Sequence, residues 1–374
     1  MHTEQRSQTL DLLKSRHLEH AIFAHPYSVT WLTGFAAPIG MGLNPFSGGA
    51  AFVWVEGQTF TLVVQDGYAG LAANFATQPN CRVLTYEGYT IQQPIHSVTT
   101  LREMLVELVG MPAHGTPVGV ESQSIPATWQ ESLVNERGLD VHSLDGALTP
   151  LRRVKTVEEI ALMRRVFAIT DRAHVAAQKA CQVGQTEIGV WSAIQTAINN
   201  EAGMPLPLGN DCVVGYRSPN NIGGAPADNI IRHDTALIVD ISTIVDGYWS
   251  DSCATYYPHQ PTPRQQELHK IVEEALDYTI SLIKPGAIAR DIDASVRGFM
   301  QQRGLPVYPH HTGHGIGIAP HESPRLVPYN EETLQVGEII MIEPGIYFPG
   351  ETSVRLEHAL LVTHDGVEIL TKHL

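Results

Sequence analysis

The chain has 374 residues, 43% of them hydrophobic, which is enough for a sizeable core and more typical of two domains than of one. Its 24 basic residues stand against 39 acidic ones, a formal net charge of -15 that disfavours binding to nucleic acid or to an anionic membrane. The first 25 residues lack the apolar core of a signal peptide, and no segment approaches the length that spans a bilayer. We therefore expect a cytoplasmic globular protein.

The first 150 residues have the pattern of one α/β domain. AFVWVEGQTFTLVV at residues 51–64 predicts a strand hairpin, and PVGVE at 117–121 predicts a further strand. LREMLVEL at 101–108 has helical periodicity. Strands that alternate with helices over this length predict an α/β layer structure. The cysteines carry no further signal, since their wide scatter without a CxxC pair is typical of reduced, buried thiols.

A second domain is expected over residues 151–374. It opens with a long helix, because Thr156 and Glu159 have capping-box spacing and apolar residues follow with helical period. Two stretches then repeat one pattern 102 residues apart: Gly184 and Gly286 each lead apolar residues at the same offsets. A duplicated helix-helix-sheet unit explains this repeat. The alternative is that helical periodicity makes any two helices look alike.

The segment VDISTIVDGYWSDSCATY places two aspartates on one face of a predicted hairpin. Asp246-Gly247 between two strand-like runs is a strong signal for a two-residue turn. Counting back along the pair sets Asp240 opposite Cys253, and Asp240 and Asp251 become diagonal neighbours with Cβ atoms roughly 7 Å apart. That spacing suits two carboxylates that reach common ions. The alternative is two aspartates that face solvent.

Two further acids lie in apolar runs, Glu343 at the end of EIIMIE and Glu357 within SVRLEHALLV. Acids are almost never fully buried unless they are paired or bound to metal. Arg355 could neutralise one of them but cannot serve all four carboxylates together. If the four meet, like charges at about 4 Å repel by about 4 kcal/mol per pair at a surface-like dielectric, so folding would demand cations. Two divalent ions would match their charge.

Residues 310–325, HHTGHGIGIAPHESPR, hold four histidines on a backbone whose glycines disfavour a helix. A tight strand with bends is the better prediction, with glycines that would let the strand approach a metal closely. A lone histidine is more often structural or exposed than a ligand. Beside four acids, however, His314 is the expected nitrogen ligand, and such an oxygen-rich set suits Mn²⁺ or a similar ion.

These residues, in the phrases TGHGIG, HESP, EPGIY and VRLE, resemble the five-ligand signature of the pita-bread metallopeptidases, which include prolidase, aminopeptidase P and methionine aminopeptidase. HPYSVTWLTGF at 25–35 resembles the amino-terminal domain shared by creatinase, prolidase and aminopeptidase P, which methionine aminopeptidases usually lack. The resemblance spans the whole chain. It implies a creatinase/prolidase-like α/β domain, then a pita-bread α+β catalytic domain with internal pseudo-twofold duplication, and metal ligands at Asp240, Asp251, His314, Glu343 and Glu357.

The resemblance also implies a mechanism and a homodimer. Two divalent ions per chain, with Mn²⁺ preferred and Co²⁺ or Zn²⁺ as alternatives, would supply a bridging hydroxide that attacks the peptide bond. Glu343 would carry the proton from that water to the leaving amine. By resemblance His321 stabilises the tetrahedral intermediate, His310 lies near the substrate pocket, and Arg355 orients Glu357 and the bound peptide. His311 has no assigned role and is interpreted as a bystander or as a group behind the ligands.

Two positions bear on the substrate. Arg325 stands where prolidases carry an arginine that can grip a substrate's free carboxylate, which favours a dipeptidase. Gly223 departs from the family pattern, because a substrate-binding histidine usually stands 17 residues before the first aspartate ligand. His233 lies too close to Asp240 to replace it. We therefore expect an intact metal site and an altered substrate pocket.

The sequence thus predicts a dinuclear-metal dipeptidase that hydrolyses Xaa-Pro or related dipeptides, with a short peptide as its partner. One alternative is an Xaa-Pro aminopeptidase of the aminopeptidase P type. Another is a sibling hydrolase of a different C-N bond, as creatinase is on this fold. A non-catalytic binding protein on the same scaffold would be expected to have eroded ligands, and all five positions are filled.

Overall fold

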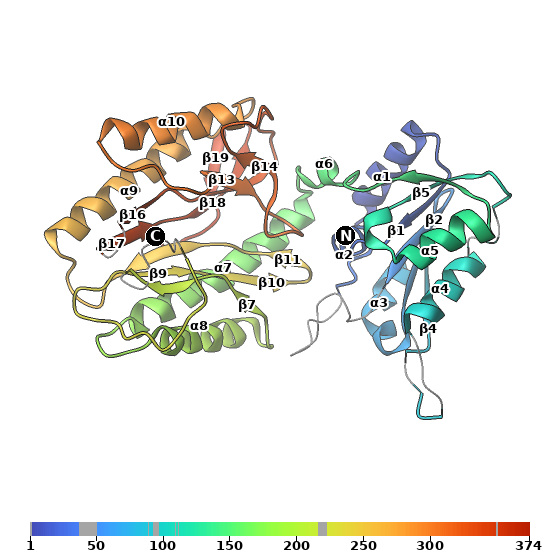
Figure 1. Cartoon of the computed structure of the whole chain (residues 1–374), viewed down its shortest axis with the longest axis horizontal. Helices are drawn as coiled ribbons and strands as arrows, with labels where there is room; N and C mark the ends of the chain where they lie inside the picture. The colour runs from blue at the N-terminus through green and yellow to red at the C-terminus, as the bar shows by residue number, and fades with distance from the viewer. Residues whose placement is uncertain are drawn as a thin grey trace. The chain divides into compact units, whose positions relative to one another are not determined.

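The computed structural model describes most of the chain, namely residues 2–36, 51–88, 90–92, 97–108, 110, 112–215, 223–348 and 351–374. The chain divides into two compact units, Met1–Leu151 and Arg152–Leu374. Figure 1 draws the first in blue to green and the second in green to red. Within the described ranges, no helix combines the length and the apolar character needed to cross a membrane.

The first unit is built on a six-stranded sheet of order β4-β3-β2-β1-β5-β6. β2 is antiparallel to both of its neighbours, β1 and β3. β4 runs parallel to β3, β5 runs parallel to β1, and β6 runs parallel to β5. The hairpin predicted at residues 51–64 is confirmed as β2 and β3. The strands are β1 (His20–Phe23), β2 (Phe52–Glu56), β3 (Thr59–Gln65), β4 (Cys81–Tyr86), β5 (Pro117–Val120) and β6 (Asp140–Ser143).

Helices flank this sheet, and an apolar cluster that includes Phe52, Leu101 and Trp129 packs two of them against it. Glu121, buried at the end of β5, accepts hydrogen bonds from the backbone N–H groups of Ala24 and His25 at 2.8 Å each, where the second helix begins. The helices are α1 (Thr3–Ser15), α2 (Pro26–Thr33), α3 (Ala69–Ala76), α4 (Ser97–Leu108), α5 (Ala127–Glu131) with a π-helical continuation (Ser132–Glu136), and α6 (Thr149–Arg152).

The second unit contains two helix pairs, α7 (Val157–Ala180) with α8 (Glu187–Ala202), and α9 (Pro263–Leu282) with α10 (Ala289–Gln302). Both long helices begin at a capping box, Thr156 with Glu159 and Thr262 with Gln265. In each box the threonine oxygen accepts from a backbone N–H of the first turn, and the longer side chain accepts from the threonine N–H. The helix start predicted at Thr156 is confirmed.

The repeat of the sequence reappears in the backbone hydrogen bonds. Gly184 and Gly286, 102 residues apart, both have positive φ, 85° and 82°. The N–H of Gly184 donates to the carbonyl of Ile231 at 2.9 Å, and that of Gly286 donates to the carbonyl of Leu334 at 2.8 Å. Two residues after each glycine, the chain forms an isolated antiparallel bridge to the segment whose carbonyl accepts the hydrogen bond of that glycine. The two helix pairs are therefore connected to their strands in the same way.

The strands of the second unit lie between the helix pairs, with α9 and α10 on one side and α7 and α8 on the other (Figure 1). They form sheets of order β12-β9-β8, β11-β10-β7 and β14-β13-β15-β18-β19, and a hairpin of β16 and β17. Their bounds are β7 (Leu208–Gly209), β8 (Cys212–Val214), β9 (Leu237–Asp240), β10 (Ser242–Val245), β11 (Tyr248–Trp249), β12 (Cys253–Tyr256), β13 (Gly313–Gly315), β14 (Glu322–Leu326), β15 (Ile339–Ile342), β16 (Gly345–Phe348), β17 (Thr352–Arg355), β18 (His358–Thr363) and β19 (Gly366–Ile369).

The irregular strand predicted at residues 310–325 is present as β13 and β14, with a register shift after His314. Two of its glycines are required by close contacts with neighbouring strands, and their expected role in letting the strand approach a metal stays a prediction. A Cβ on Gly313 would lie 2.1 Å from the carbonyl oxygen of Met341, and a Cβ on Gly315 would lie 2.3 Å from that of Ser323. The glycines therefore let β13 fit between the backbones of β14 and β15. The four cysteines are buried free thiols, as predicted.

Candidate metal centre

Asp240 and Asp251 come from the predicted hairpin. Asp240 ends β9 and pairs with Cys253 of β12, in the register expected from the sequence. Asp246 and Gly247 both have positive φ, 50° and 84°, which is the geometry of a type I′ turn. Because residues two apart in register share a face, both aspartates are directed to the same side of the hairpin.

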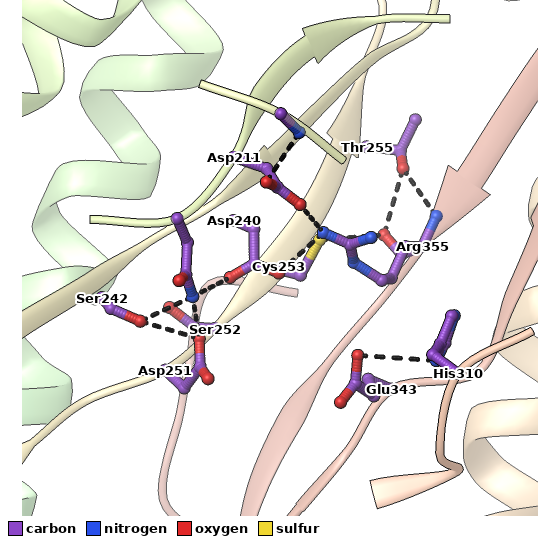
Figure 2. A network of polar contacts seen from close by, with 12 residues as sticks. Asp211, Asp240, Ser242, Asp251, Ser252, Cys253, Thr255, His310, Glu343 and Arg355 are labelled. Carbon is purple, nitrogen blue, oxygen red and sulfur yellow. Dashed lines mark hydrogen bonds and ion pairs between the residues drawn. The ribbon is translucent and has the colours of Figure 1, made fainter. Parts of the chain in front are cut away.

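One amide links the two aspartates. Asn210, whose backbone has a φ of 80°, donates from Nδ2 to Oδ1 of Asp240 at 3.0 Å and to Oδ1 of Asp251 at 2.9 Å. The same nitrogen lies 2.6 Å from Oγ of Ser242, which itself donates to Asp251 at 3.1 Å (Figure 2). Neither Asn210 nor Ser242 is among the site residues predicted from the sequence. Only the position of Ser242 opposite Asp251 in the hairpin count could have pointed to it.

His314 lies in β13 and is 1% exposed. Its Nδ1 is 2.9 Å from the carbonyl oxygen of Gly315, so the N–H is assigned to Nδ1 and the lone pair to Nε2. Nε2 lies 3.7 Å from Oδ2 of Asp251 and 3.7 Å from Oε1 of Glu343. Burial lowers the pKa of His314 to about 3, so at neutral pH the ring is in the neutral form that binds metal.

Glu357 lies between β17 and β18, where its N–H donates to the carbonyl of Cys253 at 2.9 Å. Its carboxylate is buried, and within the described part of the chain Oε2 has no hydrogen-bond partner. One ligand atom each from Asp251, His314 and Glu357 lies within 4.8 Å of the other two. A buried carboxylate oxygen without a donor, beside an imidazole lone pair and a second acid, fits a divalent cation.

The electrostatics of these acids support the same fit. Burial raises the pKa of Asp251 and that of Glu357 well above their ordinary values, and the neighbouring carboxylates raise both further. Burial also raises the pKa of Asp240, against the opposing effect of Arg355. Burial raises the pKa of Glu343 too, but the hydrogen bond from His311 and the nearby histidines outweigh it and lower that pKa. A cation would allow all four acids to be ionised together.

Arg355 is the positive group among these acids. Its Nη2 donates to Oδ2 of Asp240 at 2.8 Å and to Oδ2 of Asp211 at 2.5 Å (Figure 2). Its Nη1 donates to the hydroxyl of Tyr347 at 3.3 Å, and that hydroxyl lies 2.8 Å from Nε2 of His310. A continuous chain of hydrogen bonds thus joins His310 to Asp240. Tyr347 ends the phrase EPGIY but was given no role from the sequence, and no local pattern connects Asp211 to this site.

The other histidines and Arg325 border the ligands. Nε2 of His311 lies 2.7 Å from Oε1 of Glu343, and the exposed ring of His321 lies 4.2 Å from that of His314 between centroids. Arg325 is exposed on β14, directly opposite His314 in the register of β13 and β14. Paired residues of neighbouring strands face the same side of the sheet. The exposed guanidinium can therefore meet a ligand that approaches His314.

Gly223 is in close contact with a carboxylate. A Cβ placed on it would lie 1.8 Å from Oδ2 of Asp211, and the N–H of Gly224 donates to Oδ1 of Asp211 at 2.7 Å. The carboxylate of Asp211 therefore fills the space that a side chain at position 223 would need. His233 is exposed and stacks on His259, with ring centroids 4.1 Å apart.

Comparisons with known proteins add independent evidence. Residues 161–364 match the model of Metallopeptidase family M24, and residues 5–154 match that of the Creatinase/Prolidase N-terminal domain. An uncharacterized peptidase of Staphylococcus aureus strain USA300 is 31% identical over 260 residues, 68% of this chain and 73% of the relative. The Xaa-Pro dipeptidase of Pyrococcus horikoshii is 28% identical over 335 residues, 88% of each chain. The structure of the prolidase from Pyrococcus furiosus aligns with a TM-score of 0.79 and 25% identity, over 97% of this chain and 99% of that one.

Proposed function

Because the chain belongs to metallopeptidase family M24, we propose that it is a dinuclear-metal dipeptidase that hydrolyses Xaa-Pro or related dipeptides. The predicted fold class, a creatinase/prolidase-like domain followed by a metallopeptidase domain, and the prediction of a metal-dependent peptidase are confirmed. The buried cluster of Asp251, His314 and Glu357 is the observation that carries the proposal. The names of the dipeptidase from P. horikoshii and the prolidase from P. furiosus support the substrate class.

The proposed centre would hold two divalent ions between four carboxylates and one imidazole. Two ions would match the carboxylates in charge, and Mn²⁺ suits an oxygen-rich set, with Co²⁺ or Zn²⁺ as alternatives. When bound, the ions would polarise the scissile carbonyl and lower the pKa of a water molecule. The ligands would be Asp240, Asp251, His314, Glu343 and Glu357, of which Asp240 is held in place by Arg355 and Asn210.

The side chains around the ions would then move protons and orient the substrate. Glu343, whose side chain is 12% exposed, would take the proton from the attacking water and pass it to the leaving amine. His321 would donate a hydrogen bond to the oxygen of the tetrahedral intermediate. His310, held by Tyr347, and Arg355, held against Asp240, would border the bound peptide. Arg325 would bind the free carboxylate of a dipeptide.

One observation favours a second candidate function. The carboxylate of Asp211 occupies the space beside Gly223, so this wall of the site offers an acceptor where prolidases usually place an imidazole. A site built with different polar groups selects a different substrate. A sibling activity on another C-N bond therefore remains the alternative, as does an Xaa-Pro aminopeptidase.

The test is a substrate panel on metal-stripped protein reloaded with Mn²⁺, Co²⁺ or Zn²⁺. We expect Xaa-Pro dipeptides to be cleaved faster than non-proline dipeptides and tripeptides, and about two ions per chain by metal analysis. Full activity of the stripped protein without rescue by Mn²⁺ would contradict a metal-dependent mechanism. Faster cleavage of tripeptides would favour the aminopeptidase, and no cleavage of any peptide would favour the sibling hydrolase.

We also propose that the protein works as a cytoplasmic homodimer. The proposal is supported by the resemblance of both halves of the chain to prolidases and by a net charge of -15, which disfavours nucleic-acid and membrane partners. Light scattering on the purified protein tests the dimer, and a monomeric mass would rule it out.

A further inference from the structure

Three imidazoles form a cluster beside the proposed ligands. One ring nitrogen from each of His311, His314 and His321 lies within 4.8 Å of the other two. The ring centroids are 5.0 Å apart for His311 and His314, 5.4 Å for His311 and His321, and 4.2 Å for His314 and His321. We infer that His311 is an additional metal ligand, which gives one of the two ions a second imidazole and strengthens its preference for Zn²⁺ or Co²⁺ over Mn²⁺. This inference rests on the proposed dinuclear centre.

The distances agree with the coordination shell of one ion. Ligand atoms at about 2.1 Å from an ion are about 3.0 Å apart at a right angle and about 3.4 Å apart at the tetrahedral angle. Oε1 of Glu343 lies 2.7 Å from Nε2 of His311 and 3.7 Å from Nε2 of His314, close to this range on either side. Small movements would therefore bring one carboxylate oxygen and two imidazoles onto a single ion.

The ring orientations agree as well. The bond from Nδ1 of His314 to the carbonyl of Gly315 leaves Nε2 as an acceptor on the side of Asp251 and Glu343. Nε2 of His311 faces the same oxygen of Glu343, where a cation would replace the proton that the two groups share. The side chain of His311 is 16% exposed and His321 is exposed, so an ion can reach the cluster from solvent.

The opposite end of the centre has a different chemistry. The amide of Asn210 bridges Asp240 and Asp251, and the hydroxyl of Ser242 donates to Asp251. The groups gathered there present oxygen ligands. Carboxylate oxygens suit Mn²⁺, whereas imidazoles suit Zn²⁺ and similar ions. The two ends therefore differ in the ion they prefer, and the centre is expected to take one hard ion and one ion that favours nitrogen.

The experiment loads metal-stripped full-length protein from mixtures with an increasing excess of Mn²⁺ over Zn²⁺, because a given site generally binds Zn²⁺ more tightly than Mn²⁺. Elemental analysis and calorimetry measure the bound metals and their affinities. We expect a range of Mn²⁺ excess in which the wild type holds one Mn²⁺ and one Zn²⁺ per chain. His311→Ala should weaken the Zn²⁺ site at least tenfold, change the visible spectrum of the Co²⁺-loaded protein, and leave Mn²⁺ binding unchanged. His364→Ala, a change at an exposed histidine in the turn between β18 and β19, is the matched control and should bind both metals normally.

A second variant separates a ligand from a hydrogen-bond partner. Glutamine at position 311 can still donate to Glu343 but is a poor ligand for Zn²⁺. His311→Gln should therefore resemble His311→Ala, with circular dichroism used to check the fold of both. A wild-type Zn²⁺ affinity and Co²⁺ spectrum in either variant would overturn the inference while leaving the dipeptidase intact. Failure of the wild type to bind two ions would instead overturn the proposed centre itself.

Discussion

The two halves of the catalytic unit share one backbone frame but contribute different side chains to the candidate site. In the half built on α7 and α8, Asp240 is the last residue of β9. In the half built on α9 and α10, β15 ends 102 residues later at Ile342, and the acid is the next residue, Glu343. The first half supplies aspartates from a hairpin, and the second supplies His314 and two glutamates. The shared backbone arrangement therefore fixes where the strands end, whereas the residue types of the proposed ligands differ between the two halves.

The halves also differ in how their acids are neutralised. Asp240 and Asp251 receive hydrogen bonds from Arg355, Asn210 and Ser242. Glu357, in the other half, is buried with a carboxylate oxygen that no described group satisfies. The aspartates of the first half are therefore partly stabilised by the protein's own donors, whereas Glu357 depends on a cation.

The largest expected effect is on turnover. Glu343→Gln keeps the shape of the side chain but removes the carboxylate that would carry the proton, so kcat should fall about 10²- to 10⁴-fold. Circular dichroism should show a retained fold, and metal analysis should find at least one ion per chain. A variant with nearly normal turnover would remove Glu343 from its proposed role.

The next effect is on stability. Arg355→Met leaves the buried Asp240 and the partly buried Asp211 without their cationic partner, which should cost about 3 to 5 kcal/mol of unfolding free energy. Urea denaturation of the metal-stripped protein measures this loss. Added Mn²⁺ should restore part of it, because a cation can replace the guanidinium beside Asp240. An equal loss with and without metal would show that the two halves are not coupled through this charge.

Asn210→Ala should have a smaller effect confined to the first half. The change removes the donor shared by Asp240 and Asp251, and the expected loss is about 1 to 3 kcal/mol in the metal-stripped protein. The loss should shrink when metal is bound, because a cation also satisfies both carboxylates. Unfolding curves at two metal concentrations check this, with Asn199→Ala as a control asparagine on α8 outside the site. An effect that does not depend on metal would contradict the proposed role.

The smallest expected effect is a pH dependence of stability that comes from a buried histidine in the first half. His174 on α7 is buried, with its ring nitrogens 2.9 Å from the hydroxyl of Tyr256 and 3.0 Å from Oγ of Ser252, whereas the position 102 residues later is Leu276, buried in the core. Burial holds the pKa of His174 well below its ordinary value of 6.5. Below pH 6.5 the unfolded chain therefore binds a proton that the folded chain does not.

Stability should consequently fall as the pH drops below 6.5, by up to about 1.4 kcal/mol per pH unit for one such group. His174→Gln should remove this contribution and flatten the difference between melting curves recorded at pH 7.5 and pH 5.5. An unchanged slope in the variant would assign the acid sensitivity to other groups.

Local sequence patterns predict much of the fold and of the candidate site. The remaining features depend on long-range contacts. The capping boxes at Thr156 and Thr262 and the turn at Asp246-Gly247 are set by neighbours in sequence, so they could be predicted. The contact of Arg355 with Asp211 joins residues 144 apart in the sequence, and no periodic pattern predicts it. The backbone of Asn210 is in the left-handed region, which the residue type alone does not reveal. The contact of His311 with Glu343 depends on the pairing of β13 with β15, which no local pattern predicts.

The contact between Gly223 and Asp211 couples two positions of the site. A side chain placed at position 223 requires the carboxylate of Asp211 to move, because its first atom would lie 1.8 Å from Oδ2 of that aspartate. Moving or shortening Asp211 also takes a partner from Arg355. We therefore expect substitutions at positions 223 and 211 to be non-additive, so that libraries varying both positions together report more than single-site scans.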